Sequence, residues 1–273
     1  MTSERRRAPS SHARGRKREG GGRQGPIVVV GRRPALEAVR SGRAIEVLVA
    51  EGSRSTPALR EVVEAAGASA VTVTTVPSER IESLSDGALH QGVAARVHLP
   101  PPLPEAELPK RPWSPEAIVV VMDGVTDPQN LGALARTAEA AGAEALVTRR
   151  HRAAPVGSVA LKASAGALIH LPLAEVANLP RAMGHLKDAG FWVVGLDASG
   201  SSSIFDEPPV GRLALVLGAE GEGLSRLVRE SCDDLLAIPL HGKVESLNVS
   251  VAAGVALYSY ALSRRKTGAK KRM

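Results

Sequence analysis

Three segments in the second half of the sequence place small and polar residues directly after an apolar run. In the first, residues 123–142, Asn130 stands where a helix would be capped, and Arg136 follows inside the expected helix. These two residues could serve a binding site. A helix cap and a solvated arginine would explain them equally well.

The second segment, residues 213–225, contains Gly218, Gly221 and Gly223 after an apolar strand. Glycines at such a place let the backbone approach a ligand closely, although an ordinary turn would also use them. The third segment, residues 238–254, is a loop that enters a helix rich in small residues. Its Ser246 and Asn248 are either site residues or helix caps.

Several familiar kinds of site are excluded. The glycines lack the G-x-G-x-x-G spacing, and no P-loop, serine-hydrolase elbow or paired-histidine zinc helix is present. The single cysteine, Cys232, excludes an intramolecular disulfide framework and a cysteine-cluster metal site. We therefore expect no metal centre, and we expect Cys232 to act as a small buried apolar residue.

Strands that alternate with helices must position these loops, and this pattern predicts an α/β protein. The expected strands are residues 27–30, 45–50, 70–74, 93–99, 118–122, 145–148, 167–171, 191–196, 213–217 and 235–239. The expected helices are residues 34–39, 57–66, 77–84, 133–141, 179–189 and 248–262. The apolar strands of the second half predict a parallel sheet with helices on both faces.

Composition divides the chain into five parts. Seven prolines between Pro100 and Pro115 predict an extended linker. The expected parts are a disordered basic tail (1–25), a small α/β domain (26–99), the linker (100–116), a second α/β domain (117–263) and a basic C-terminal tail (264–273).

The net charge of +7 is unevenly distributed, because each of the two tails carries +6 and residues 26–263 together carry −5. Flexible basic arms favour a polyanion partner such as RNA or DNA, while a solubilising tail is the alternative interpretation. Neither tail has the apolar face that membrane binding needs, and no apolar run is long enough to span a membrane. With no signal-peptide core either, we expect a cytoplasmic protein.

The three segments together resemble the motifs of the SpoU/TrmH family of RNA ribose 2′-O-methyltransferases, in the SPOUT superfamily. The matching patterns are N-x-G-x-x-x-R-x-A-x-x-x-G, L-G-x-E-x-x-G and I-P-x-x-G-x-x-x-S-L-N-V-S, within residues 118–262. The N-terminal half is similar to that family's ribosomal-protein-like RNA-binding domain, ending in the turn His90-Gln91-Gly92. This pairing points to the branch that modifies a guanosine of 23S rRNA.

The resemblance implies a deep trefoil knot in the C-terminal domain, a homodimer formed through that domain, and S-adenosylmethionine bound in the knot. It also implies two sets of site residues. The catalytic set is Asn130, Arg136, Glu220, Ser246 and Asn248. The cofactor set is Leu217, Gly218, Ala219, Gly221, Ile238, Leu240, Ser246, Leu247 and Asn248.

The role of Arg136 has two interpretations. A proposal for the family makes the matching arginine the base that accepts the hydroxyl proton, whereas arginine side chains are normally always charged. Arg136 could instead orient the phosphate and stabilise the developing alkoxide.

Two local features stand apart from the motifs. Glu245 occupies a place where the family pattern suggests a smaller residue, which could alter RNA contact. The run Arg149-Arg150-His151-Arg152 is either a solvated loop or an edge that grips phosphate.

The resemblance implies methyl transfer from S-adenosylmethionine to a ribose 2′-oxygen of structured RNA, most simply rRNA. Two alternatives stand beside it. One is a non-catalytic RNA-binding or ribosome-assembly protein on the same fold, and the other is tRNA as the substrate. A pure binder would not need Asn130, Arg136, Glu220, Ser246 and Asn248 together.

Overall fold

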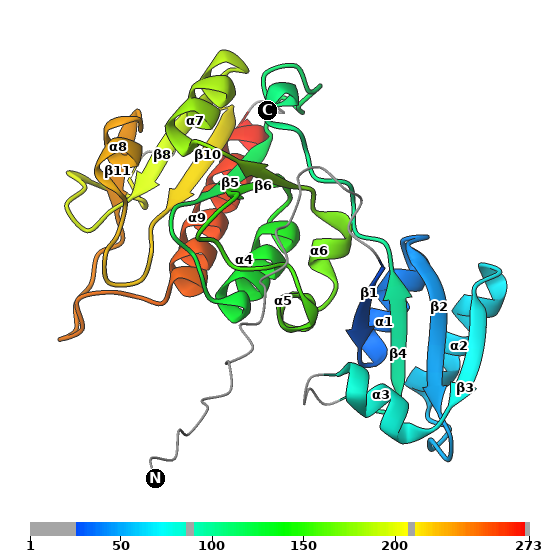
Figure 1. Cartoon of the computed structure of the whole chain (residues 1–273). Helices are drawn as coiled ribbons and strands as arrows, with labels where there is room; N and C mark the ends of the chain where they lie inside the picture. The colour runs from blue at the N-terminus through cyan, green and yellow to red at the C-terminus, as the bar shows by residue number, and fades with distance from the viewer. Residues whose placement is uncertain (1–25, 86–89, 207–210, 271–273) are drawn as a thin grey trace, which may run out of the picture.

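The computed structural model describes residues 26–85, 90–206 and 211–270, so the N-terminal basic segment lies outside the described residues. Within this part the chain folds into two α/β units that lie side by side (Figure 1). No helix among the described residues is long and apolar enough to cross a membrane.

The N-terminal unit is a mixed sheet with helices packed against it. Its elements are β1 (Ile27–Val30), α1 (Arg32–Arg40), β2 (Ala44–Ala50), α2 (Pro57–Ala68), β3 (Thr72–Val76), α3 (Ser78–Leu84) and β4 (Val93–Val97). The strands take the order β1-β4-β2-β3, and of the three pairings only that between β2 and β3 is parallel. The expected small α/β domain is therefore confirmed.

The C-terminal unit contains the larger sheet. Its elements are η1 (Glu105–Glu107), β5 (Ile118–Met122), α4 (Pro128–Ala140), β6 (Ala143–Arg149), α5 (Ser158–Ala163), α6 (Ala167–His170), β7 (Leu173–Val176), α7 (Leu179–Asp188), β8 (Phe191–Leu196), β9 (Ser202–Ser203), β10 (Arg212–Leu217), α8 (Arg226–Glu230), β11 (Asp234–Ala237) and α9 (Val249–Lys270). The strand order is β7-β6-β5-β10-β8-β11-β9, and every pairing in it is parallel.

Strand β5 shows why this sheet is buried on both faces. All five of its residues are buried, and successive side chains point to opposite faces. Ile118, Val120 and Met122 pack in the core beneath α4 and α9. Val119 and Val121 pack in the core beneath α7. The predicted two-sided parallel sheet is thus confirmed.

The proline-rich segment covers one face of the larger sheet. It has little regular structure, but Leu103, Leu108 and Trp113 are buried in the core beneath α7. The Trp113 ring meets Phe191 edge-on at a centroid distance of 5.2 Å. Arg212 donates hydrogen bonds to the carbonyl oxygens of Trp113 and Ser114. The segment is therefore packed in place over much of its length.

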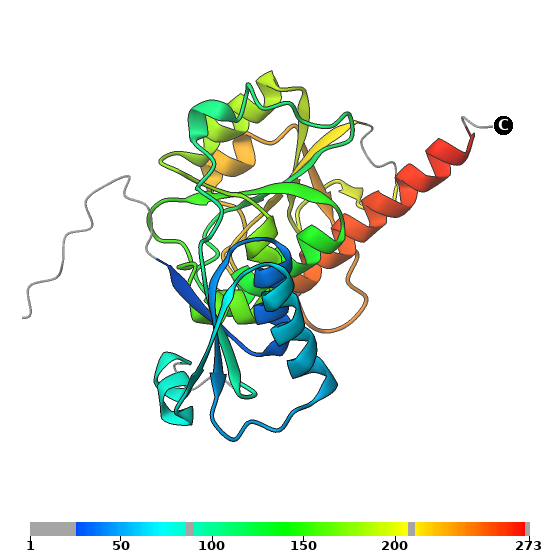
Figure 2. The same cartoon turned by 90° about the vertical axis from the view of Figure 1, so that its right-hand side faces the viewer.

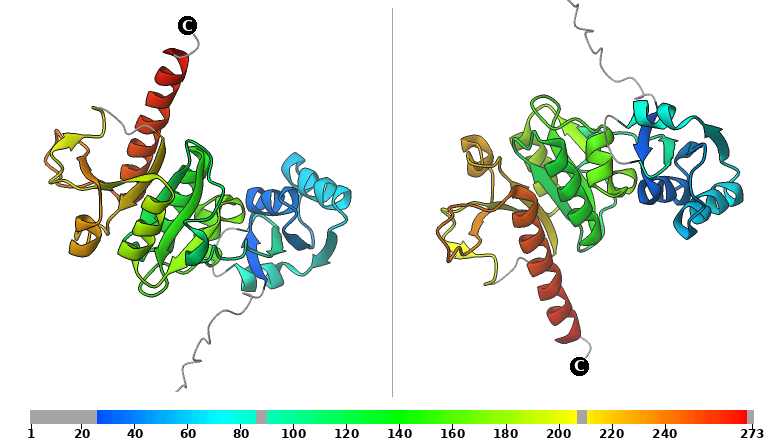
Figure 3. Two further views of the ribbon diagram at one scale, coloured as in Figure 1. Left: turned by 90° about the horizontal axis from the view of Figure 1, so that it is seen from above. Right: turned by 90° about the horizontal axis from the view of Figure 1, so that it is seen from below.

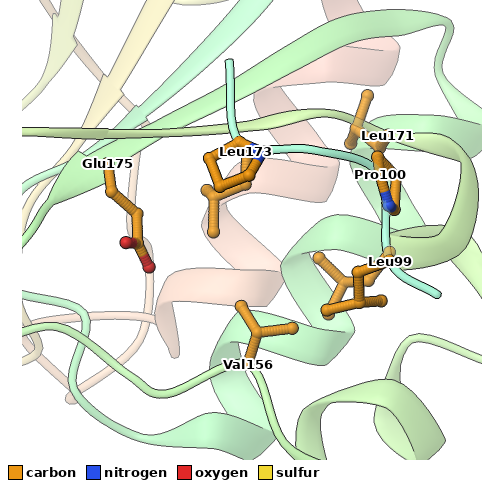
Figure 4. Close-up of a pocket in the computed structure, with 8 residues that line it drawn as sticks. Leu99, Pro100, Val156, Leu171, Leu173 and Glu175 are labelled. Carbon is orange, nitrogen blue, oxygen red and sulfur yellow. The ribbon is translucent and has the colours of Figure 1, made fainter. Parts of the chain in front are cut away.

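The two units meet where α1 and β1 approach α5 and α6. One apolar core continues across this junction, and the Nε2 of His170 lies 3.4 Å from the Glu37 carboxylate. Figure 4 shows a small cavity nearby, between the start of the linker and β7. Its volume of about 40 Å³ has room for water and not for a nucleotide.

Two sequence expectations about local structure are wrong. Residues 167–171, expected as a strand, form helix α6, and the neighbouring strand is β7 at Leu173–Val176. A five-residue apolar run fits a buried helical turn as well as a strand. Asn130 does not cap α4, because Asp127 occupies the cap and accepts a hydrogen bond from the Gln129 N–H.

The last helix is longer than the sequence suggests. Helix α9 continues to Lys270, past the expected end at residue 262, so most of the segment expected as a C-terminal tail is helical. Figures 2 and 3 show its C-terminal end projecting beyond the body of the domain. The last three residues lie outside the described residues.

Helix α4 sits close to α5 because Gly132 has no side chain. A Cβ atom at this position would collide with Ala163 and with backbone atoms of Ala160 and Ser164. We predict that Gly132→Ala lowers the free energy of unfolding by about 1 to 3 kcal/mol, the usual cost of overpacking. Chemical denaturation monitored by circular dichroism measures this change.

Gly184→Ala is the matched control, because Gly184 lies in helix α7 and a Cβ there meets no atom within 4 Å. We expect it to leave stability unchanged or to raise it by about 0.5 to 1 kcal/mol, since alanine is the better helix former. Equal effects at the two positions would contradict the close packing of α4 on α5.

Candidate active site

A cavity of about 410 Å³ opens at the edge of the larger sheet where β8, β10 and β11 end. Ligands of parallel α/β sheets bind at the carboxyl ends of the strands. Eight of the nine predicted cofactor residues line this cavity: Leu217, Gly218, Ala219, Gly221, Ile238, Leu240, Ser246 and Leu247. They come from the loops after β10 and β11, as the spacing of the motifs suggested.

The three motifs meet at the side chain of Asn248. Its Nδ2 donates one hydrogen bond to Asn130 Oδ1 at 2.9 Å and a second, short one to Glu220 Oε1. Asn130 is 118 residues away in the sequence, and Glu220 is 28 residues away. We call these three residues the amide junction. It connects the first turn of α4, the loop after β10 and the start of α9.

The amide junction also fixes the start of α9. Asn248 Oδ1 accepts hydrogen bonds from the Ser250 N–H at 3.0 Å and from the Ser250 hydroxyl at 2.6 Å. Glu220 Oε1 accepts a further hydrogen bond from the Val249 N–H at 3.3 Å. A carboxylate at a helix N-terminus is favoured by the helix dipole. Asn248 is therefore both a helix cap and a link between motifs.

Gly218 lines the cavity and also meets a steric requirement that its position in the sequence does not reveal. The sequence indicates that glycine there lets the backbone approach a ligand. In the structure, a Cβ on Gly218 would collide with the backbone of Gly223 and Leu224. The loop folds back on itself at this point, and Ala219 and Gly223 exchange backbone hydrogen bonds of 3.1 and 2.9 Å. The glycine is required by the loop itself.

Arg136 is the predicted site residue that the fold leaves outside both the cavity and the amide junction. It lies six residues beyond Asn130 on α4, which corresponds to about 9 Å along the helix and about 120° around it. Its side chain is exposed, and no hydrogen bond or ion pair within the described chain holds it. Asn130 and Asn248 do not line the cavity either, but the amide junction joins them to Glu220, which does.

One wall of the cavity is formed by residues that lie outside the three motifs, and the sequence did not predict them. Asp197 lies directly after β8, and its side chain, which is 7% exposed, accepts hydrogen bonds from the Ser199 N–H and hydroxyl. Arg229 of α8 lies 2.7 Å from its carboxylate, and both residues line the cavity. The signal that could have located this wall is the polar stretch Asp197-Ala-Ser-Gly200 after a buried strand.

The charges around the cavity favour a cationic ligand. Glu220, Glu222 and Glu245 line it and are exposed, whereas the lining cation Arg229 is already paired with Asp197. The glutamate that departs from the family pattern is thus part of the cavity wall. The other residues of the second motif that line the cavity are glycines and aliphatic residues.

No cluster of three metal-ligating side chains occurs among the residues that the structure describes. The only cysteine, Cys232, is partly buried, and desolvation raises the pKa of its thiol to about 12. The thiol is therefore protonated and unreactive at neutral pH.

The run Arg149-Arg150-His151-Arg152 divides into two parts. Arg149 points inward, where its Nη2 lies 2.8 Å from the buried carboxylate of Asp123. Arg150, His151 and Arg152 are exposed. The backbone on either side of them is fixed by hydrogen bonds from Arg150 N–H to Val176 and from Ala154 N–H to Val125. Three side chains of the run remain available to a ligand.

Comparison with known proteins places both units in one family. The model of the SpoU rRNA methylase family matches residues 117–258. The model described as RNA 2′-O ribose methyltransferase substrate binding matches residues 28–103. Together the two matches cover most of the described chain.

Two curated relatives are each 40% identical to this chain. One is the 23S rRNA (guanosine-2′-O-)-methyltransferase RlmB of Escherichia coli, over 78% of this chain and 88% of the relative. The other is a tRNA/rRNA methyltransferase of Mycobacterium avium, described as uncharacterized, over 87% of this chain and 77% of the relative.

A solved structure has the same fold over almost the whole chain. It is the SpoU methyltransferase AviRb from Streptomyces viridochromogenes in complex with the cofactor AdoMet, with a TM-score of 0.74 and 27% identity. The match covers 88% of this chain and 91% of that one. With its three motifs joined at the amide junction and both family models matched in order, this chain belongs to the SpoU rRNA methylase family.

Proposed function

We propose that this chain transfers a methyl group from S-adenosylmethionine to the ribose 2′-hydroxyl of a guanosine in 23S rRNA. The observation that carries this proposal is the amide junction, in which Asn248 binds Asn130 and Glu220 beside the cavity. A protein that only bound RNA would have no need for three distant motifs joined next to a ligand-sized cavity. The 40% identity to the 23S rRNA methyltransferase of Escherichia coli supports the choice of RNA and nucleotide.

The cavity fits the proposed cofactor in size, charge and lining. When bound, S-adenosylmethionine supplies an electrophilic methyl group on a positively charged sulfur. Glu220, Glu222 and Glu245 give the cavity a negative field that favours such a cation. Leu217, Ile238 and Leu247 offer aliphatic surface, and the loop of residues 218–223 offers backbone groups.

Arg136 is proposed to act on the RNA. A guanidinium keeps its charge in proteins, which favours stabilisation of a developing 2′-alkoxide and of the adjacent phosphate over proton abstraction. Arg136 lies outside the cavity, so the ribose must lie between the cavity and an Arg136 side chain, placed there by the bound RNA or by a second protomer. Ser246 lines the cavity and Asn248 binds the lining residue Glu220, and both are proposed to hold the shape of the cavity.

We further propose a homodimer formed through the C-terminal unit. Val251, Tyr258 and Leu262 of α9 are exposed, and their spacing of seven and four residues places them on one face of the helix. An apolar stripe on a long helix is a common dimer surface. A trefoil knot is also proposed, supported by the contacts that Asn248 makes with Glu220 in the loop after β10 and with Asn130 of α4. We also propose a cytoplasmic location, which an rRNA substrate supports.

The proposed function is tested with the purified full chain and radiolabelled S-adenosylmethionine. We expect label in protein-free 23S rRNA transcripts, recovered after nuclease digestion as 2′-O-methylguanosine, and no label in tRNA. Label in tRNA alone would favour the tRNA alternative. Calorimetry that detects no S-adenosylmethionine binding, together with no label, would favour the non-catalytic RNA-binding alternative.

For Arg136→Ala, we predict a loss of turnover of about 10²- to 10³-fold, the usual effect of removing an electrostatic stabiliser. The dissociation constant for S-adenosylmethionine, measured by calorimetry, should stay within about 3-fold, because Arg136 does not line the cavity. Arg136→Lys should also be impaired if the planar guanidinium binds its partner with two hydrogen bonds. A tenfold or greater loss of cofactor affinity in Arg136→Ala would place Arg136 in the cofactor site.

The exposed part of the Arg150–Arg152 loop is proposed to bind RNA phosphates. The double variant Arg150→Glu, Arg152→Glu should weaken RNA binding and lower the slope of log affinity against log salt by about 1 to 2, since each phosphate contact contributes about 0.7 to 0.9. Filter binding at several salt concentrations measures both effects.

Lys110→Glu is the control, because it reverses an exposed positive charge on the proline-rich segment. Its salt slope should match that of the unmodified protein. If the loop variant kept the same slope as this control, the loop would be solvated and would not contact phosphate.

A further inference from the structure

Asp123 is a buried carboxylate to which the proposed reaction assigns no role. It follows β5 directly, and its side chain is only 4% exposed. It does not line the cavity. Burying a charged carboxylate is unfavourable unless hydrogen bonds and an opposite charge compensate it. Its contacts therefore indicate what the residue is for.

Asp123 binds both ends of the loop that carries Glu220. Its backbone N–H donates to the Leu217 carbonyl oxygen at 2.8 Å, where the loop begins. Its Oδ2 accepts a hydrogen bond from the Ser225 N–H at 2.7 Å, where the loop ends. A Cβ on the next residue, Gly124, would lie 3.1 Å from Ala219 Cβ, so the loop also rests against this turn. We call residues 217–225 the cofactor loop.

Arg149 completes the arrangement from the end of β6. Its Nη2 donates to Asp123 Oδ1 at 2.8 Å and to the Ser225 hydroxyl at 3.1 Å. The guanidinium thus neutralises the buried carboxylate and binds the same end of the loop. Each oxygen of Asp123 has a separate partner, which fixes the orientation of the carboxylate.

The position of the cofactor loop matters for both parts of the site. Residues 217–223 form a wall of the cavity, and Glu220 in their midst holds Asn248 and the Val249 N–H. The loop is stiffened within by the paired hydrogen bonds of Ala219 and Gly223. If its two ends were free, this stiff unit could shift as a body and change both the cavity and the amide junction.

We propose that Asp123, with Arg149 as its counter-ion, is a positioning residue that fastens the two ends of the cofactor loop and so sets cofactor affinity. The inference rests on the proposed function, because it assumes that the cavity binds S-adenosylmethionine. The residue acts through the loop and touches neither the cofactor nor the RNA.

The test compares the full-length protein with its Asp123→Asn variant, which keeps the size of the side chain and removes the charge. We expect the dissociation constant for S-adenosylmethionine, measured by calorimetry, to rise about 10- to 100-fold, as expected for loss of a charge-assisted hydrogen bond. Turnover at saturating cofactor should fall much less, because the reacting groups are unchanged. In the cofactor-free protein, hydrogen exchange of peptides covering residues 217–225 should become faster.

Glu105→Gln is the matched control. Glu105 also bridges a guanidinium and a backbone N–H, those of Arg181 and Ala177, but it lies in the proline-rich segment away from the cavity. This variant should leave cofactor affinity and exchange of the cofactor loop unchanged. If Asp123 had a purely structural role, Asp123→Asn would lower the stability of the protein without a selective change in cofactor affinity or in the hydrogen exchange of the cofactor loop.

The double variant Asp123→Asn, Arg149→Gln removes both charges and keeps the test usable if the single variant fails to fold. We expect it to retain the weak cofactor binding and the fast loop exchange. Normal cofactor affinity and unchanged loop exchange in a folded variant would overturn the inference. Failure of the unmodified protein to bind S-adenosylmethionine would instead refute the proposed function.

Discussion

One side-chain amide organises the candidate site. The nitrogen of Asn248 has two N–H donors, and the structure uses one for Asn130 and the other for Glu220. Its oxygen caps α9 through Ser250. Every hydrogen-bonding group of the side chain is therefore engaged, and each partner comes from a different part of the chain. The amide therefore links helix α4, the cofactor loop and the start of helix α9 to one another.

The parallel sheet makes this meeting possible. Because its strands all run in the same direction, the loops after β8, β10 and β11 emerge at one edge. The buried strands supply the rigid base, with β5 packed on both faces. Asp123 and Arg149, at the ends of β5 and β6, connect these strands to the cofactor loop by hydrogen bonds. The polar residues at the edge are thus held by the apolar ones beneath them.

Much of this organisation could be predicted from the sequence, because apolar runs, proline content and motif spacing are local signals. For strands 27–30, 118–122 and 191–196, the predicted limits agree with those in the structure. The errors occurred where local signals are ambiguous. The run 167–171 fits a helix or a strand until its neighbours are known. Helix α4 begins at the cap Asp127 and at Pro128 rather than at Asn130, although asparagine is also a common helix cap. Residues that bind each other across 100 positions, such as Asp123 and Ser225, give no sign of it in one sequence.

The central claim is that Asn130 and Asn248 act as one unit, and a double-mutant cycle tests it directly. Asn130→Ala, Asn248→Ala and the double variant would be compared by turnover of 23S rRNA at a fixed concentration of S-adenosylmethionine. Two residues joined by one hydrogen bond should give non-additive losses, so the double variant should lie within about 3-fold of Asn248→Ala alone. Losses that multiply in the double variant would show that the two residues act separately and would contradict the amide junction as the organising contact.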